Sequence, residues 1–143
     1  MQSLLPEIRD QLQALSGLHR KSDAYVTPHE NWMPTGTRQP CVGIKDAGTS
    51  RRELGCGALE LRMSVALACF VHMAGEGETP LCGDTGLFML ADAATDLLLA
   101  GWLDVAGCQA LTVGNDRPSE MFQADNGQFL VKMVRTVVYT VER

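Results

Sequence analysis

Residues 58–73 read ALELRMSVALACFVHM, and this stretch decides the fold. Every odd position from Leu59 to Met73 is apolar, whereas the even positions are polar from Glu60 to Ser64 and then mostly apolar. Strict alternation predicts a strand with one buried face, and the change after Ser64 predicts a part that is covered on both faces. At ~3.3 Å per residue this strand is about 50 Å long. The run GEGE that begins at residue 75 is expected to end it.

A second alternating run, FLVKMVRTVVYTV at 129–141, follows the turn sequence Asp125-Asn126-Gly127 and the short run EMFQA. Asn-Gly between two strand-like runs predicts a hairpin, because both residues of the favoured two-residue turn must accept a positive φ. Two shorter apolar segments, 22–26 and 41–44, predict further strands. The sheet is therefore expected to be mostly antiparallel, with a long hairpin at its centre.

Two other segments have the periodicity of helices. Near the N-terminus the apolar residues follow the 3-4-3 spacing of one helical face, with Ser3 as a cap and Gly17 as a stop. A second amphipathic helix lies between residues 80 and 101, starting either at Thr79-Pro80 or at Asp84. The two apolar faces consist of Leu5, Ile8, Leu12 and Leu15, and of Leu87, Leu90, Ala91, Ala94, Leu97 and Leu98. These elements predict one α+β domain over residues 1–143, with both helices packed on the sheet.

Two segments between the predicted strands are expected to project as loops. Residues 27–40 hold three prolines and a glycine without any period, and residues 45–57 (KDAGTSRRELGCG) are rich in charge and glycine. Arg51, Arg52 and Glu53 stand at the middle of the second segment. One interpretation is a mobile, solvated loop. The other is a contact in which the arginines pair with acidic residues of a neighbouring subunit.

The charge distribution is compatible with the second interpretation, although such an asymmetry is usually just a solvated face. Residues 61–128 hold nine acidic and two basic side chains, whereas residues 1–60 hold seven of each. The acidic partners are expected within residues 76–104 of the neighbour. Trp32 and Trp102 are further candidates for a subunit interface, because tryptophan is enriched at energetically important protein–protein contacts. The alternative is that each tryptophan fills an edge of the core.

Composition excludes several classes of protein. The chain has 143 residues and a net charge of −5, which argues against a main role in gripping nucleic acid phosphates, and no sequence-specific nucleic acid partner is expected. No apolar run approaches the ~20 residues that cross a bilayer, so no membrane partner is expected. Glu7, Arg9 and Asp10 interrupt the apolar stretch that a signal peptide would need.

The search for chemistry yields weak candidates. The cysteines at 41, 56, 69, 82 and 108 form no CxxC pair, which favours reduced thiols over a zinc site or a disulfide framework. GEGETPLCGDTG at 75–86 has the glycines of a phosphate loop but lacks its lysine and carries acids. Other candidate groups are the pair Cys82 and His72, the pair Asp92 and Asp96 on the polar side of the second helix beside Thr95, and the trio Asp116, Glu120 and Asp125. Each is more typical of ordinary structure, so no catalytic residue, cofactor or metal is expected.

The whole-chain pattern resembles the small tail-terminator or tail-completion proteins of tailed bacteriophages. The resemblance rests on LLPEIRDQLQAL, PCVGIKDAG, the long alternating strand, ADAATDLLLAGW and FLVKMVRTVVYTV in this order. It implies a tail-terminator-like α/β subunit of a hexameric ring that caps the head-proximal end of the tail tube and joins it to the head connector.

The implied partners are other copies of the chain, the tail tube protein and the head–tail connector protein. The implied location is the tail or neck of the virion, after synthesis in the host cytoplasm. The alternatives are another assembly module, such as a tube, head-completion or baseplate component or a bacterial secretion-tube relative, and a small enzyme or ligand-binding domain.

Overall fold

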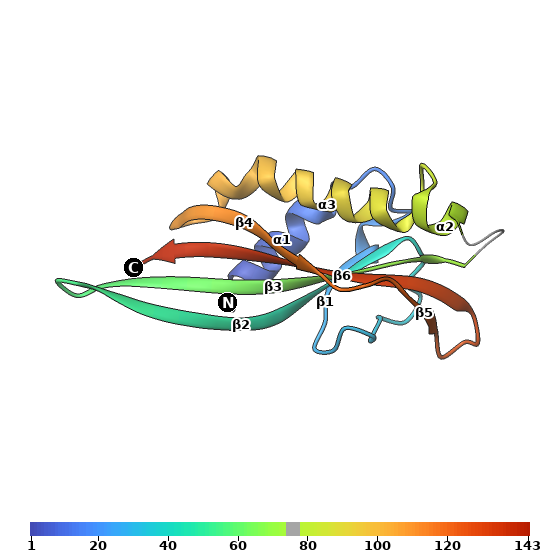
Figure 1. The fold of residues 1–143 in the computed structure, drawn as a ribbon, viewed down its shortest axis with the longest axis horizontal. Helices are drawn as coiled ribbons and strands as arrows, with labels where there is room; N and C mark the ends of the chain where they lie inside the picture. Colours follow the sequence, from blue (N-terminus) through green and yellow to red (C-terminus); the bar gives the residue numbers. More distant parts are fainter. Residues whose placement is uncertain (74–77) are drawn as a thin grey trace.

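Six strands form a single mixed, mostly antiparallel sheet, and helices cover one of its faces (Figure 1). The computed structural model describes residues 1–73 and 78–143. The strand order is β1-β2-β3-β6-β4, and β5 also pairs with β6. The strands are β1 (Ala24–Val26), β2 (Cys41–Gly55), β3 (Ala58–His72), β4 (Cys108–Asp116), β5 (Glu120–Gln123) and β6 (Phe129–Glu142). Among the described strands, β1 alone runs parallel to its neighbour, β2.

The alternating stretch forms β3, as the sequence predicts. Its odd-numbered side chains from Leu61 to Val71 are buried in the core between the sheet and the helices. Ala66, Ala68 and Phe70 are buried on the opposite face, in a second cluster with Tyr25 and other apolar groups. The prediction that β3 is covered on both faces beyond Ser64 is therefore confirmed. The GEGE run predicted to end this strand begins outside the described residues.

Two helices, α1 and α3, pack on the same face of the sheet and make the class α+β, as predicted. The helical segments are α1 (Leu4–Leu12), η1 (Lys21–Asp23), α2 (Glu78–Cys82), α3 (Leu87–Gly101) and η2 (Trp102–Asp104). The side-chain amide of Gln11 donates to the backbone carbonyl of Gly101 at 3.0 Å, which ties α1 to the end of α3.

The predicted helix boundaries are wrong in two places. α1 ends at Leu12 rather than before Gly17, and the side chain of Ser3 makes no capping hydrogen bond. α3 begins after Gly86, not at Thr79-Pro80 or Asp84, because a separate short helix, α2, precedes it. Thr95, expected on the polar side of α3, is buried. Its hydroxyl donates to the carbonyl of Ala91 at 2.8 Å, so the buried hydroxyl group has a hydrogen-bond partner.

The loop predicted over residues 45–57 is a strand over most of its length. β2 continues to Gly55 and pairs with β3 as far as Ala58, so the two strands form a long hairpin whose turn contains Cys56 and Gly57. Charge and glycine suggested a loop, but β3 provides a long edge along which β2 can pair. Residues 50–60, the outer end of this hairpin, are called the hairpin arm below (Figure 1).

The terminal hairpin is present, with a turn that differs from the prediction. Ala124 and Gly127 close it through the hydrogen bonds Ala124 N–H to Gln128 O and Gly127 N–H to Ala124 O, both 2.9 Å. Only Gly127 has a positive φ, 85°, because the turn has three residues and ends in a bulge rather than being a two-residue turn. β4 was not predicted, since most of its side chains are exposed and show no alternation.

One stretch, Glu78–Asp104, contains an 18-residue window of mean hydropathy 1.4 and is long and apolar enough to cross a membrane. The expectation that no apolar run approaches this length is therefore wrong. The structure divides the stretch into α2, α3 and η2. α3 has 15 residues, or ~22 Å at 1.5 Å per residue, which is short of the ~30 Å hydrocarbon core. One side of α3 is buried against the sheet, as in a core helix.

Amide exchange of β6 is expected to be the slowest in the chain. β3 pairs with one edge of β6, and β4 and β5 pair with the other, so opening this strand breaks both ladders. The amides of residues 131–137 should exchange on the order of a hundredfold more slowly than those of the 27–40 loop. Hydrogen exchange followed by mass spectrometry measures this ratio. Equal rates in the two segments would contradict the central position of β6.

Candidate subunit interface

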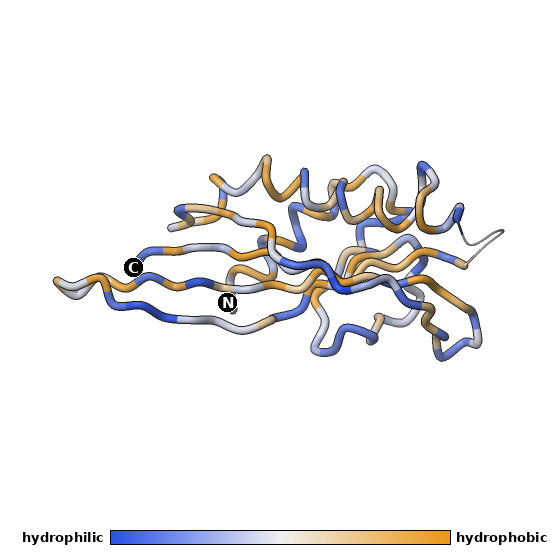
Figure 2. Tube along the Cα trace, viewed as in Figure 1, coloured by the Kyte–Doolittle hydropathy of each residue, from blue (hydrophilic) through white to orange (hydrophobic). Residues whose placement is uncertain are grey.

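The hairpin arm carries the two arginines that the sequence singles out. Arg51 pairs across the ladder with Leu61, and Arg52 pairs with Glu60, so the two side chains leave opposite faces of the arm. Both are exposed, and within residues 1–73 and 78–143 neither forms an ion pair. Figure 2 shows the polar outer half of β2 running beside β3. The arm therefore presents two uncompensated cations to solvent.

The outer edge of β2 is a second feature of the arm. β1 pairs with β2 only from Val42 to Ile44, so in the described part of the chain no strand covers this edge beyond Ile44. The strand bulges between Asp46 and Thr49, where the amide of Gly48 donates to the Asp46 carboxylate at 2.7 Å. Charges and bulges are the usual protection of an exposed sheet edge against unspecific pairing.

The two candidate tryptophans lie on opposite faces of the sheet. Trp32 belongs to the 27–40 loop and packs edge-on against Tyr25 at 6.5 Å between ring centroids, beside the core cluster on the side away from the helices. Trp102 follows α3 in η2 on the helix-covered side. The structure therefore does not bring the five candidate interface residues Arg51, Arg52, Glu53, Trp32 and Trp102 into one patch.

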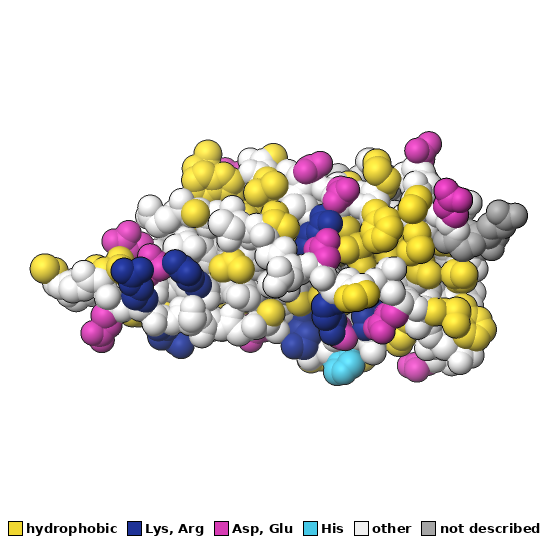
Figure 3. Space-filling model, viewed as in Figure 1, with side chains coloured by type: hydrophobic (Ala, Val, Ile, Leu, Met, Phe, Trp, Pro, Cys, Tyr) yellow, Lys and Arg dark blue, Asp and Glu magenta, His cyan; other side chains and the backbone are white. Residues whose placement is uncertain are grey.

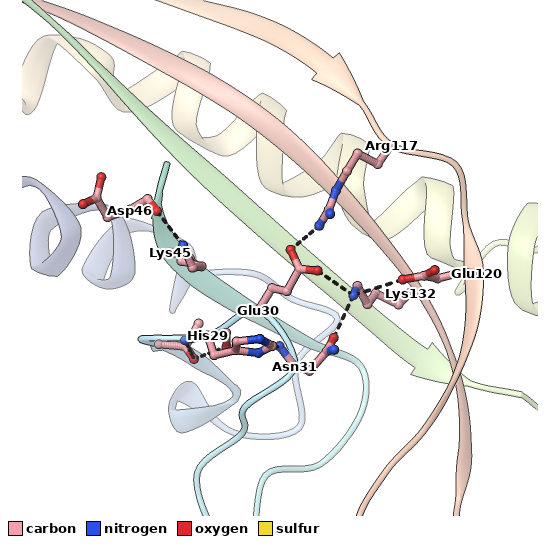
Figure 4. A network of polar contacts seen from close by, with 9 residues as sticks. His29, Glu30, Asn31, Lys45, Asp46, Arg117, Glu120 and Lys132 are labelled. Carbon is pink, nitrogen blue, oxygen red and sulfur yellow. Dashed lines mark hydrogen bonds and ion pairs between the residues drawn. The ribbon is translucent and has the colours of Figure 1, made fainter. Parts of the chain in front are cut away.

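A buried lysine holds the 27–40 loop against the sheet (Figure 4). The side chain of Lys132, on β6, is only 3% exposed, and its Nζ lies 3.0 Å from Glu30 Oε1 and 3.1 Å from Glu120 Oε1. It also donates to Asn31 Oδ1 at 2.7 Å. Arg117 pairs with the second oxygen of Glu30. The segment is irregular, as predicted, but it is anchored rather than free.

This cluster perturbs the acid of the loop. Burial alone would raise the pKa of Glu30, but hydrogen bonds from Lys132 and Arg117 outweigh burial and leave the pKa below its ordinary value of 4.5. A carboxyl group whose pKa is lowered on folding stabilises the folded state above its ordinary pKa. That stabilisation is lost as the pH falls below 4.5 and through the folded-state value.

Replacement of Glu30 by glutamine is expected to lower the free energy of unfolding at pH 7. The difference from the wild type should become smaller as the pH falls. The loss at pH 7 should be about 1–2 kcal/mol, since a charge-assisted pair becomes a neutral hydrogen bond. Urea unfolding at pH 7 and at progressively lower pH measures the difference between wild type and variant. Glu53→Gln, at an exposed acid of the arm, is the control. A difference for Glu30→Gln that stays constant below pH 4.5 would refute this role for the carboxylate.

A second polar cluster contains two of the acids, Asp92 and Asp116, that the sequence offered as candidate chemical groups. Arg135, on β6, donates to Asp116 Oδ1 and to Asp92 Oδ1, both at 2.8 Å, and to Thr95 Oγ1 at 3.0 Å. These contacts join β6 to β4 and to α3. They also raise the pKa of Arg135, mainly through the hydrogen bond to Asp116. Asp92 and Asp116 are therefore structural partners of an arginine, and they do not form an acid pair with Asp96 or a cation site with Glu120.

The remaining chemical candidates are not assembled into a site. Burial raises the pKa of the Cys41 and Cys69 thiols to about 12. Cys82 and His72 share no hydrogen bond, although both are exposed. The candidate phosphate loop lies partly outside the described residues, and the rest of it includes the five-residue helix α2. Within residues 1–73 and 78–143 no group of three or more histidine, cysteine or acidic side chains is placed to hold a metal.

A cavity of about 610 Å³ lies between the end of α1, the end of β3 and the start of α3. Its walls are largely apolar, and its polar lining includes His19, His72, Gln39 and Asp84. This cavity could not be predicted from the sequence, because its lining residues come from segments far apart in the chain.

The outer surface of α3 and η2 is apolar as well. Phe88, Met89, Leu99 and Leu103 are exposed there, and two exposed acids, Asp96 and Asp104, accompany them. In the described part of the chain neither acid has a cationic partner. Figure 3 shows hydrophobic side chains gathered over this helix, at the top of the view. These six residues are called the outer α3 surface below.

Comparison with models of known protein families and with curated protein sequences finds no match to this chain.

Proposed function

We propose that the chain is a structural subunit that assembles with copies of itself into a closed ring of the kind found in phage tails. The observation that carries the proposal is that one subunit has two separate exposed surfaces of complementary character. Within residues 1–73 and 78–143, the hairpin arm exposes Arg51 and Arg52 without ion-pair partners, and the outer α3 surface exposes apolar groups with two aspartates that form no ion pair. A head-to-tail ring requires two different, complementary surfaces on each subunit.

The place of this ring in a virion rests on the resemblance to tail-terminator and tail-completion proteins. In such a setting the ring is hexameric, caps the head-proximal end of the tail tube and contacts the tube protein on one side and the head connector on the other. The α+β sheet with two helices on one face is compatible with this role. A tube, head-completion or baseplate component shares the same expectation of self-assembly.

A second candidate function is the binding of a small ligand in the cavity of about 610 Å³. Ligand pockets of 300–1,000 Å³ with apolar walls and a few polar groups are common. This function needs no self-association, and the two candidates therefore differ in the mass of the particle in solution.

Light scattering coupled to size-exclusion chromatography tests the proposal. The ring function predicts one discrete oligomer, with a mass near six times 15.5 kDa, that persists on dilution. A monomer at every concentration would contradict it and favour the ligand-binding function.

A further inference from the structure

α3 has apolar side chains on its buried side and also on part of its exposed side, where Asp92 and Asp96 accompany them. Leu87, Leu90 and Leu98 face the sheet and are buried, whereas Met89 and Leu103 on the outside are 51% and 74% exposed. Exposed apolar side chains that gather in one patch beside polar groups are typical of an interaction site. The outer α3 surface is therefore a candidate contact surface.

The charges on this surface indicate which occupant fits. Asp96, in α3, and Asp104, in η2, stand on either side of Leu99 and Leu103 along the chain. Asp92, one turn earlier, is already paired with Arg135. Asp96 and Asp104, which form no ion pair among the described residues, thus flank an apolar patch. This pattern favours a partner with cations around an apolar group over a lipid surface.

The hairpin arm has the complementary pattern. Arg51 and Arg52 leave opposite faces of the strand, and Leu54 beside them is 42% exposed. Residues 50–60 hold two arginines and two glutamates. Glu60 is paired with Arg62, just outside the arm, at 3.2 Å, so among the described residues one positive charge is left over from Arg51, Arg52 and Glu53. Within one chain the described residues include no ion pair between these arginines and Asp96 or Asp104.

We infer that the outer α3 surface of one copy receives the hairpin arm of the next copy. In this contact Leu54 packs against Leu99 and Leu103, and Arg51 and Arg52 reach Asp96 and Asp104 on either side. The inference rests on the proposed ring function and adds to it the identity of the two surfaces in contact.

Two charge-reversed variants and their mixture test this contact. Variant Arg51→Glu/Arg52→Glu and variant Asp96→Arg/Asp104→Arg should each associate at least tenfold more weakly than the wild type, because each sets like charges against each other. When the two are mixed, every arm meets a surface of opposite charge, so assembly should return. Sedimentation velocity measures the species, and circular dichroism checks the fold. Asp10→Arg/Asp125→Arg, with the same change in net charge at exposed sites elsewhere, should assemble as the wild type does.

The outcomes separate the contact from the ring function. If the wild type forms the ring and Asp96→Arg/Asp104→Arg forms it equally well, or if mixing restores nothing, the proposed contact is wrong while the ring function stands. If the wild type is monomeric, the ring function fails and the contact fails with it. Flotation of a monomeric wild type with phosphatidylcholine vesicles would assign the outer α3 surface to lipid and also overturn the inference. Leu103→Gln, which removes apolar contact without changing charge, should weaken the ring and leave the circular dichroism spectrum unchanged.

Discussion

Replacement of Lys132 by methionine is expected to lower the free energy of unfolding by about 2–3 kcal/mol, because the charge-assisted hydrogen bonds of its buried ammonium group are lost, while Glu30 keeps Arg117 and Glu120 is exposed to solvent. The ammonium group lies 3.0 Å from Glu30 and 2.7 Å from Asn31. Methionine keeps much of the volume but none of the donors, so the 27–40 loop loses its main attachment to β6. Urea unfolding at pH 7 measures the change.

Lys45→Met is the matched control. Lys45 lies on β2, is half-buried, and its ammonium group donates only to the backbone carbonyl of Asp46 at 3.0 Å. Its replacement should change the free energy of unfolding by less than about 0.5 kcal/mol, as is usual for surface sites. Equal effects of the two substitutions would show that the Lys132 cluster does not stabilise the fold. Faster proteolysis within residues 27–40 of Lys132→Met would locate the loosened segment.

Reversal of both arm charges, Arg51→Glu/Arg52→Glu, is expected to weaken self-association by roughly a hundredfold at low salt, since like-charge contacts in an interface cost several kcal/mol. The fold should stay intact, because both side chains are exposed and contribute nothing to the core. Added salt should reduce the difference between variant and wild type, as screening shortens the range of the repulsion. Sedimentation velocity at two ionic strengths measures both the loss of association and its dependence on salt.

Arg9→Glu/Arg38→Glu makes the same change in net charge in α1 and the 27–40 loop and should leave assembly unaffected. If the arm variant assembles as the wild type does at moderate salt, the arm is not the contact. The two arginines then serve only to keep the free edge of β2 soluble.

The strands of the sheet's centre could be predicted because burial imposes a period on their sequences. β3 alternates in polarity up to Ser64 and is apolar on both faces beyond it, β6 keeps a partly alternating pattern, and both occupy the expected positions. The outer half of β2 could not be recognised, since an edge strand exposes both faces and KDAGTSRRELG shows no alternation. β4 was missed for the same reason.

The polar clusters around Lys132 and Arg135 could not be predicted from the sequence. Lys132 stands 102 residues from Glu30, in a run where a lysine is expected to point to solvent, and Glu30 lies in a segment without any period. Thr95 was placed on a polar face by its type, whereas Arg135 and the carbonyl of Ala91 satisfy its hydroxyl within the structure. Such contacts depend on how distant segments meet, and local patterns do not record that.

Negative-stain electron microscopy of the purified protein tests the central proposal most directly. A ring subunit with complementary arm and outer α3 surfaces predicts closed particles with rotational symmetry, six-fold if the resemblance to tail terminators holds, and their loss in Arg51→Glu/Arg52→Glu. Fields of single small particles from the wild type, or open chains of variable length, would contradict a closed ring.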